Sequence, residues 1–199
     1  MAAILRWINA LTLTSRAYTC GHCGNPVASN VGYVRGSYQD GSGSPDAFVY
    51  ICHHCYAPSY FGQQGQVPGI RFGADVKGID EATVQQLYDE ARDCFSKNAF
   101  TAAVLCCRKL LMHIAVSKGA DKNKNFMEYV EFISAKGYVP PDAKTWVDHI
   151  RTKGNEANHE IVVMSEEEAT DLLAFVEMLL KLVFEFPSAS KKYSLAPRP

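Results

Sequence analysis

Two cysteine pairs near the amino terminus constrain the fold of this chain more than any other feature. Each pair has two residues between its cysteines, and 28 residues separate the pairs, which are Cys20 with Cys23 and Cys52 with Cys55. Two intervening residues let both sulfurs of one turn face the same ion at about 2.3 Å, and a second such turn completes a tetrahedron. The spacing therefore predicts a structural Zn²⁺ site, one per chain, with a hairpin between the two turns.

Two other kinds of chemistry use the same residue types. A redox CxxC needs only one pair and a βαβ context, whereas a catalytic zinc site leaves one coordination position open for water. Four thiolates favour a structural zinc site over a redox pair and over a catalytic zinc site. His22, His53 and His54 lie beside the cysteines, where they could replace a sulfur or tune the site from outside it. We expect them to be exposed neighbours rather than ligands.

The residues around the cysteines have the pattern of short antiparallel strands. Segments 16–19, 32–38 and 47–51 alternate in hydrophobicity or are rich in aromatic residues. The segment 39–45, which separates two of them, is rich in turn-forming residues. We therefore predict a zinc ribbon over residues 14–62.

A change of period marks a second domain. Five glycines and Pro68 fall within residues 62–78 without a regular apolar pattern, which indicates a connecting segment over 63–79. From residue 80 the apolar positions recur at helical spacing, so we predict an all-α helical bundle over 80–186 and a loose tail over 187–199. The fold class is thus α+β, a small antiparallel ribbon followed by a helical bundle.

Helical periodicity recurs along the second domain. Residues 99–116 are apolar nearly all round, which is typical of a central helix. Ser165 and Glu168 form a capping box at the start of the last helix, which we expect to end before Pro187. The apolar positions of the other helices fall at 84–95, 126–133 and 143–150.

Three cysteines and one arginine stand out on these helices. Cys94, Cys106 and Cys107 have no ligand partner at a suitable spacing, and free cysteine is one of the most buried residue types. We expect these cysteines in the core. Arg108 lies in the most apolar helix, where a buried guanidinium needs a partner such as Glu90. We interpret this arginine as structural.

Composition and charge exclude some classes of protein. With 47% hydrophobic and 21% charged residues, the chain has the composition of an ordinary globular protein rather than a disordered one. The formal net charge is −1, and residues 1–74 hold four Arg against two Asp. Neither half is therefore a broadly basic nucleic-acid binder.

The same sequence bears on the cellular compartment. Arg6 and Asn9 interrupt the apolar start MAAILRWINALTL, so we expect it to belong to the mature protein. No uncharged apolar run of about 18 residues occurs, so no membrane span is expected. Paired cysteines without a secretory signal favour metal over disulfides and a cytoplasmic location.

The order of residues in the helical part resembles a known family. The relevant segments are Tyr88–Arg92, Phe100–Leu111 and Ile150–His159, followed by the capped last helix. This order resembles the prokaryotic domain of unknown function 4145, often preceded by a zinc ribbon, over about residues 80–185. The resemblance implies a relation to the HEPN helical superfamily, whose members occur in restriction, toxin and other defence systems. A prokaryotic or phage origin and a defence-related role are thus expected.

The resemblance also implies candidate catalytic residues. Catalytic HEPN proteins are metal-independent RNases that dimerise so that an Arg and a His from each subunit meet. Here seven residues separate Arg151 from His159, a longer spacer than in those enzymes. If the site is catalytic, His159 acts as general acid or base and Arg151 stabilises charge on a phosphate, with Asn155 orienting either group.

Two functions follow as hypotheses. We favour a non-catalytic interaction module, in which the zinc ribbon binds a protein or nucleic acid partner. Asn155 and His159 then cap the helix around Trp146 and bond to neighbouring backbone. The alternative is an HEPN-type endoribonuclease that uses Arg151 and His159. For RNA or DNA binding, the ribbon offers aromatic and basic side chains, namely Tyr33, Arg35, Tyr38, Tyr50 and Tyr56.

The last helix predicts how the bundle assembles. Its core face is made by Leu172, Val176, Leu179 and Val183. A second apolar set lies outside that face and needs cover, so we expect a symmetric homodimer through the helical domain. The zinc ribbon is the alternative cover. The second set consists of Phe175, Met178, Leu182 and Phe184.

Overall fold

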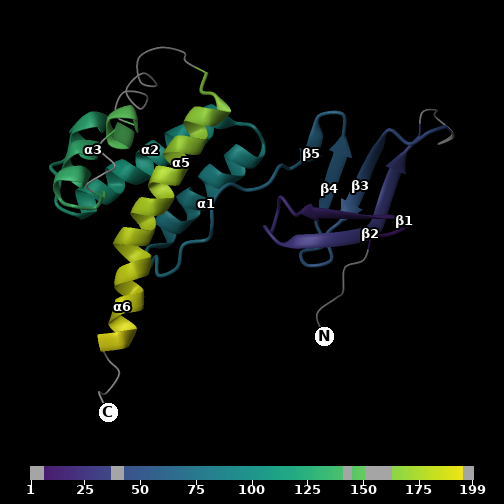
Figure 1. Ribbon diagram of the computed structural model, residues 1–199, viewed down its shortest axis with the longest axis horizontal. Coiled ribbons are helices and arrows are strands. Elements are labelled where there is room, and N and C mark those ends of the chain that lie inside the picture. Colours follow the sequence, from purple (N-terminus) through teal and green to yellow (C-terminus); the bar gives the residue numbers. More distant parts are fainter. Residues whose placement is uncertain (1–6, 37–42, 141–144, 151–162, 195–199) are drawn as a thin grey trace. The chain divides into compact units, whose positions relative to one another are not determined.

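The computed structural model describes residues 7–36, 43–140, 145–150 and 163–194 (Figure 1). The chain divides into two compact units, Met1–Arg71 and Phe72–Pro199, and the division falls within the connecting segment expected from the glycines. An antiparallel sheet lies in the first unit and helices form the second. The predicted α+β class is therefore confirmed.

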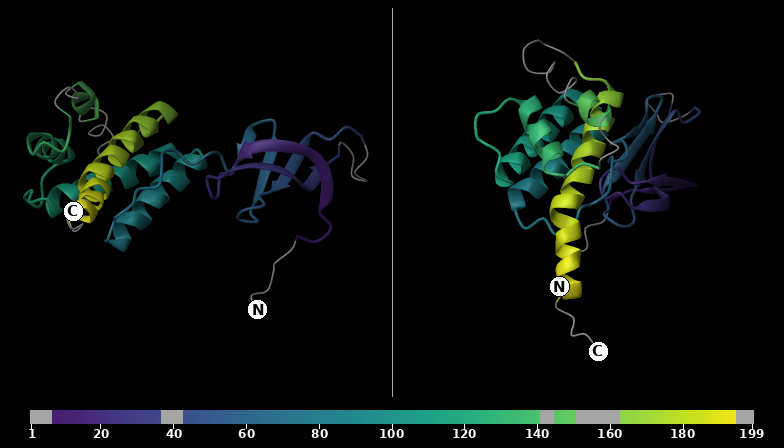
Figure 2. Two further views of the ribbon diagram at one scale, coloured as in Figure 1. Left: turned by 60° about the horizontal axis from the view of Figure 1, so that its bottom comes forward. Right: turned by 60° about the vertical axis from the view of Figure 1, so that its left-hand side comes forward.

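The first unit contains a sheet that is a simple meander. In the described residues it has five strands, each antiparallel to its neighbour, in the order β1-β2-β3-β4-β5. The register of β1 against β2 shifts between Thr12 and Arg16, and β1 curves strongly (Figure 2). The strands are β1 Leu11–Thr19, β2 Pro26–Arg35, β3 Ala47–Ile51, β4 Pro58–Gly62 and β5 Gly65–Val67.

A small aromatic cluster packs on one part of the sheet. The ring centroids of Tyr18 and Phe61 lie 5.0 Å apart, and those of Tyr50 and Phe61 lie 5.7 Å apart. Tyr50 and Phe61 are buried, whereas Tyr18 is half-buried. Each ring comes from a different strand, so the cluster ties β1, β3 and β4 together.

The second unit is a bundle built around α2. α1 spans Ala82–Ser96, α2 Phe100–Ser117, α3 Phe126–Ala135 and α5 Glu166–Leu180, and residues 145–150 are also helical. α2 contacts α1, α3 and α5, as its nearly all-round apolar sequence predicts. By length and composition alone α2 could cross a membrane, but Leu110, Leu111 and Ile114 are buried inside this bundle.

The capping box predicted for the last helix is present. The backbone N–H of Ser165 donates to the Glu168 carboxylate over 2.9 Å, and the backbone N–H of Glu168 donates to the Ser165 hydroxyl over 3.2 Å. The two residues thus satisfy backbone donors that the first helical turn would leave unpaired.

The end of that helix differs from the prediction. α5 continues through a π turn, Lys181–Glu185, into α6, Phe186–Ser194, as one rod (Figures 1 and 2). A proline inside an α-helix removes one hydrogen bond and clashes with the carbonyl four residues earlier. In the π turn just before Pro187, backbone hydrogen bonds join residues five apart instead of four, at the place where that clash would arise. Residues 187–194 are therefore helical and not a loose tail.

The apolar residues expected outside the core face of α5 divide into two groups. Phe175 is fully buried and its ring centroid lies 5.2 Å from that of Trp146, because the helical residues 145–150 pack on that side. For Phe175 the expectation was wrong. Met178, Leu182 and Phe184 are only partly buried, and they leave an apolar strip that Phe186, 56% exposed, extends.

The three helical cysteines lie in or beside the core. Cys107 is fully buried, and Cys94 and Cys106 are half-buried. Burial raises the pKa of the Cys107 and Cys94 thiols, and that of Cys106 to about 11. These thiols therefore stay protonated near neutral pH, as expected of packing residues.

Candidate metal centre

The two cysteine-bearing turns have the same backbone structure. In the first, the N–H of Cys20 donates to Asn25 O over 2.9 Å and the N–H of Gly24 donates to Cys20 O over 2.8 Å. In the second, the N–H of Cys52 donates to Ala57 O over 3.0 Å and the N–H of Tyr56 donates to Cys52 O over 2.9 Å. Each turn follows a strand, β1 or β3, so the sheet sets the distance between the two turns.

The four cysteine sulfurs form a compact cluster. The Sγ atoms of Cys20 and Cys55 lie 3.7 Å apart, those of Cys23 and Cys52 lie 3.8 Å apart, and all four are within 4.8 Å of one another. A tetrahedral ion with metal–sulfur bonds of about 2.3 Å requires sulfur–sulfur edges of about 3.8 Å. These two contacts, each joining one turn to the other, match that edge. The cysteines are thus positioned to bind one metal ion.

The thiols differ in how readily they ionise. Burial raises the pKa of Cys20. For Cys55, loss of water around the sulfur and then the neighbouring thiols raise the pKa to about 12, although the residue as a whole is exposed. Burial also opposes ionisation of Cys23, but hydrogen bonds from the Asn25 backbone and side-chain amides outweigh it and lower the pKa to about 7. A metal ion must therefore displace protons from Cys20 and Cys55 when it binds.

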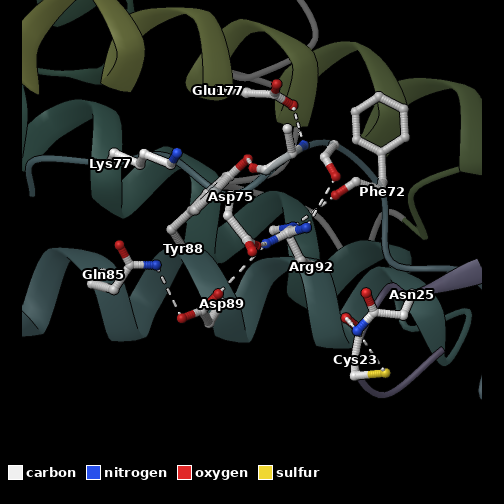
Figure 3. A network of polar contacts seen from close by, with 12 residues as sticks. Cys23, Asn25, Phe72, Asp75, Lys77, Gln85, Tyr88, Asp89, Arg92 and Glu177 are labelled. Atoms are coloured by element: carbon white, nitrogen blue, oxygen red, sulfur yellow. Dashed lines mark hydrogen bonds and ion pairs between the residues drawn. The ribbon is translucent and has the colours of Figure 1, made fainter. Parts of the chain in front are cut away.

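Polar groups around the cluster point toward the sulfurs. The side-chain amide of Asn25 donates to Cys23 Sγ over 3.4 Å (Figure 3). The backbone N–H of His54 donates to Cys52 Sγ, also over 3.4 Å. Such donors stabilise thiolate charge from outside the ligand set.

The neighbouring histidines have other contacts. His22 Nε2 lies 3.0 Å from the carbonyl oxygen of Pro58, and the rings of His53 and His54 lie 4.7 Å apart. All three are exposed, and among the described residues the metal-binding group consists of cysteines alone. The geometry thus offers four sulfur ligands and no imidazole.

The first turn requires glycine at two positions, Gly21 and Gly24, for different reasons. A Cβ on Gly21 would collide with the carbonyl oxygens of Pro68 and Gly69, so this glycine lets that segment lie against the turn. Gly24 has a φ of 71°, which few other residues adopt without strain. The equivalent position of the second turn is Tyr56, with a φ of 58°.

Of the described ribbon residues considered for nucleic acid binding, some are buried or already bonded within the ribbon. Arg35 makes a two-pronged ion pair with Asp46 at 2.8 and 2.7 Å, and Tyr50 is buried. Tyr33 donates its hydroxyl to Ile8 O over 2.5 Å, whereas Tyr56 is 57% exposed. Tyr38 lies outside the described residues, as do the catalytic candidates Arg151, Asn155 and His159.

A buried arginine network in the second unit was missed from the sequence. Arg92, only 5% exposed, donates to Asp75 over 2.6 Å and to the carbonyl oxygens of Phe72 and Gly73 over 2.8 and 3.0 Å (Figure 3). The Tyr88 hydroxyl beside it donates to Ala74 O. The network holds the segment before α1 onto that helix. The sequence contained one indication of this network, because Arg92 lies next to Tyr88 and Ala91, two positions of the predicted apolar helix face.

Comparison with known proteins gives one match. Residues 89–195, more than half of the chain, match the family described as "Domain of unknown function (DUF4145)". No curated protein and no solved structure matches the chain significantly. The match covers the helical unit from the middle of α1 onward, and the cysteine cluster lies outside it.

Proposed function

Since the chain belongs to the DUF4145 family, whose description names no activity, we propose its function from the amino-terminal site: a structural zinc ion shapes a ribbon that binds a protein partner through the surface around Tyr56. Four thiolates in a tetrahedral arrangement are a preferred structural ligand set for Zn²⁺. With every coordination position taken by sulfur, the ion has no room for a reacting water. Its contribution is to join the two turns.

The main support for this proposal is the conformation and exposure of Tyr56. It occupies the position that Gly24 holds in the first turn, and its left-handed backbone costs a non-glycine residue roughly 1–2 kcal/mol. Its side chain is 57% exposed, so burial within the ribbon does not offset that cost. Strained conformations of bulky residues cluster at binding sites. A partner that buries the phenol ring would provide the missing stabilisation.

The surface beside Tyr56 is apolar and hollowed. Trp7 and Val31 are each 44% exposed, and with Ile51 they help to line a hollow of about 300 Å³. Trp7 Nε1 donates to the backbone oxygen of Tyr56 over 2.7 Å, which holds the indole beside the second turn. Exposed tryptophan and tyrosine at a concave surface are typical of the centre of a protein interface.

Charge favours a protein partner over a nucleic acid. Among the described residues that line this hollow there is no lysine or arginine. Arg35, the basic residue suggested by the sequence, is paired with Asp46. Nucleic acid binding draws most of its affinity from cations that are free to contact phosphates. We therefore propose that an apolar segment of a protein occupies the hollow, in the cytoplasm as the paired cysteines suggest and in the defence-related role that the resemblance implies.

The experiment compares two almost equally exposed positions of the first unit. A photoreactive phenylalanine replaces Tyr56 or, as a matched control, Ile70, which is 56% exposed and does not line the hollow. After irradiation in cells, position 56 should yield a protein adduct that position 70 does not. The purified partner should then bind the wild-type chain and lose about tenfold in affinity with Tyr56→Gly, but not with Ile70→Ala. Nucleic acid adducts, or identical adducts from both positions, would overturn the proposal.

The ribonuclease hypothesis has its own test. The HEPN relation would add metal-independent RNA cleavage by Arg151 and His159. Our proposal predicts that purified wild-type protein leaves structured RNA intact in the presence of a chelator. Cleavage that disappears with His159→Ala would replace the interaction module by an enzyme.

A further inference from the structure

Arg108 is a buried cation that has no polar partner among the described residues. It is 4% exposed, and within the described part of the chain its Nη1 makes no hydrogen bond. Its close contact is with the Phe126 ring, whose centroid lies 4.4 Å from the guanidinium carbon. The ion pair expected with Glu90 is not found among the described residues. Arg92, buried to the same degree, has its donors satisfied by Asp75 and two carbonyl oxygens.

Burying a guanidinium without a partner disfavours folding, so we expect an interaction that compensates. Removing water from a charged group disfavours folding by several kcal/mol unless a partner compensates. Burial lowers the pKa of Arg108, and no acid acts in the opposite direction. A ligand that pairs with the guanidinium would compensate this cost.

Arg108 lines a hollow large enough for a small molecule. The hollow measures about 620 Å³ and lies along α2 and the start of α3. Among its described lining residues are four Lys or Arg and one His, and no Asp or Glu. Leu105, an apolar residue 48% exposed, lines it as well. The basic residues are Arg108, Lys109, His113, Lys122 and Lys124.

The acids nearest to the hollow neutralise only part of this charge. Glu81 pairs with His113 at 3.1 Å, and Glu128 pairs with Lys124 at 3.3 Å. In the described part of the chain no acid pairs with Lys109 or Lys122. Arg108, Lys109 and Lys122 thus contribute three positive charges that no described acid pairs with, which suits a dianion.

The start of α3 adds to the positive potential. Asn125, its N-cap, also lines the hollow. The capping box occupies the backbone N–H groups of Asn125 and Glu128, and the remaining donors of the first turn face the end of the helix that carries the positive dipole. Helix starts of this kind bind phosphate oxygens.

We propose that this hollow, which we call the Arg108 pocket, binds a small phosphorylated molecule. A phosphate monoester is largely dianionic at neutral pH, and its oxygens match the planar fork of a guanidinium. The phosphate pairs with Arg108 and Lys109 or Lys122, and the organic part packs against Leu105. The pocket lies wholly in the helical unit, so this inference does not depend on the zinc ribbon or on Tyr56.

Binding is tested on the full chain by isothermal titration calorimetry with phenyl phosphate, inorganic phosphate and benzoate. We expect one site per chain that prefers phenyl phosphate over each of the other probes by about tenfold or more. If inorganic phosphate binds equally well, the organic part of the ligand contributes nothing and that part of the proposal is wrong. If benzoate binds equally well, the pocket does not select a phosphate over a carboxylate. Absence of saturable binding of phenyl phosphate would overturn the site.

Variants separate this role from a structural one. Arg108→Met and the surface variant Lys109→Ala should each weaken phenyl phosphate binding by about tenfold, while Lys97→Ala, which changes an exposed lysine outside the pocket, should not. Without ligand, Arg108→Met should unfold at the same temperature as the wild type or higher, because it removes a buried charge that no described residue pairs with. A large loss of stability, or unchanged binding by both variants, would show that Arg108 is structural.

Discussion

The Sγ atoms of Cys20 and Cys55 lie 3.7 Å apart, although 35 positions separate the residues in the sequence. This contact joins the turn after β1 to the turn after β3, and the contact between Cys23 and Cys52 does the same. Each turn supplies one buried and one more accessible sulfur. A metal ion at this cluster would therefore link the two turns directly, and its loss should affect the ribbon as a whole.

Replacing one buried ligand should destabilise the ribbon and spare the bundle. Cys52→Ser removes a sulfur from the cluster, and structural zinc contributes directly to the free energy of folding of small metal-binding domains. We expect loss of bound metal and a lower unfolding temperature of the ribbon, while the helical unit keeps its unfolding temperature. Cys94→Ser, which changes a half-buried cysteine outside the cluster, is the matched control and should retain the metal.

Stability of the ribbon should depend on pH in opposite directions with and without metal. In chelated protein, Cys55 with a pKa of about 12 and Cys20 with a raised pKa bind more protons in the folded state than in the unfolded one above about pH 9. Stability should therefore fall as pH rises from about 9 to 12. In metal-loaded protein, acid should destabilise the ribbon because protons compete with metal for the thiolates.

Thermal unfolding followed from pH 4 to 11 checks both directions. The fluorescence of Trp7 reports on the ribbon if Trp146 is first changed to Phe. The same direction of pH dependence in both samples would contradict metal binding by these thiols.

Tyr56→Gly should stabilise the ribbon by about 1 kcal/mol, since glycine tolerates a φ of 58° that strains tyrosine. The reciprocal change Gly24→Ala, at a φ of 71°, should destabilise it by a similar amount. Both variants keep all four sulfurs, and chemical denaturation of the metal-loaded protein measures the difference. If Tyr56→Gly is markedly less stable, the tyrosine serves the fold rather than a partner.

The helical unit should form a homodimer through the apolar strip of Met178, Leu182, Phe184 and Phe186. A hollow of about 350 Å³ along α5 and α6 includes the first, second and fourth of these residues. Light scattering should give about twice the chain mass of 22.0 kDa, and Phe186→Asp should reduce it to one chain. A wild-type mass of one chain at micromolar concentration would reject the dimer.

Local chemistry explains which features could be predicted from the sequence. The cysteine spacing determines two identical turns, and a capping box needs only Ser165 and Glu168, so both follow from a few neighbouring residues. The α+β class follows from periodicity in the same way. Each of these features depends on contacts within a turn or along one element.

Features that depend on distant partners could not be predicted. The hydrogen-bond acceptors of Arg92 lie 17 to 20 positions earlier, in a segment without periodicity. Burial of Phe175 depends on Trp146 from another helix, and the passage of the last helix through Pro187 depends on a π turn that has no sequence signature of its own. For Arg108, no acid among the described residues is the partner expected from the sequence.

The metal content of freshly purified protein tests the central claim, that the cysteine cluster holds a structural zinc ion, most directly. Elemental analysis combined with X-ray absorption at the zinc edge measures both the amount of metal and its ligands. The account predicts one zinc per chain, surrounded by four sulfurs at about 2.3 Å. Protein without metal, or zinc with fewer than four sulfur neighbours, would contradict it.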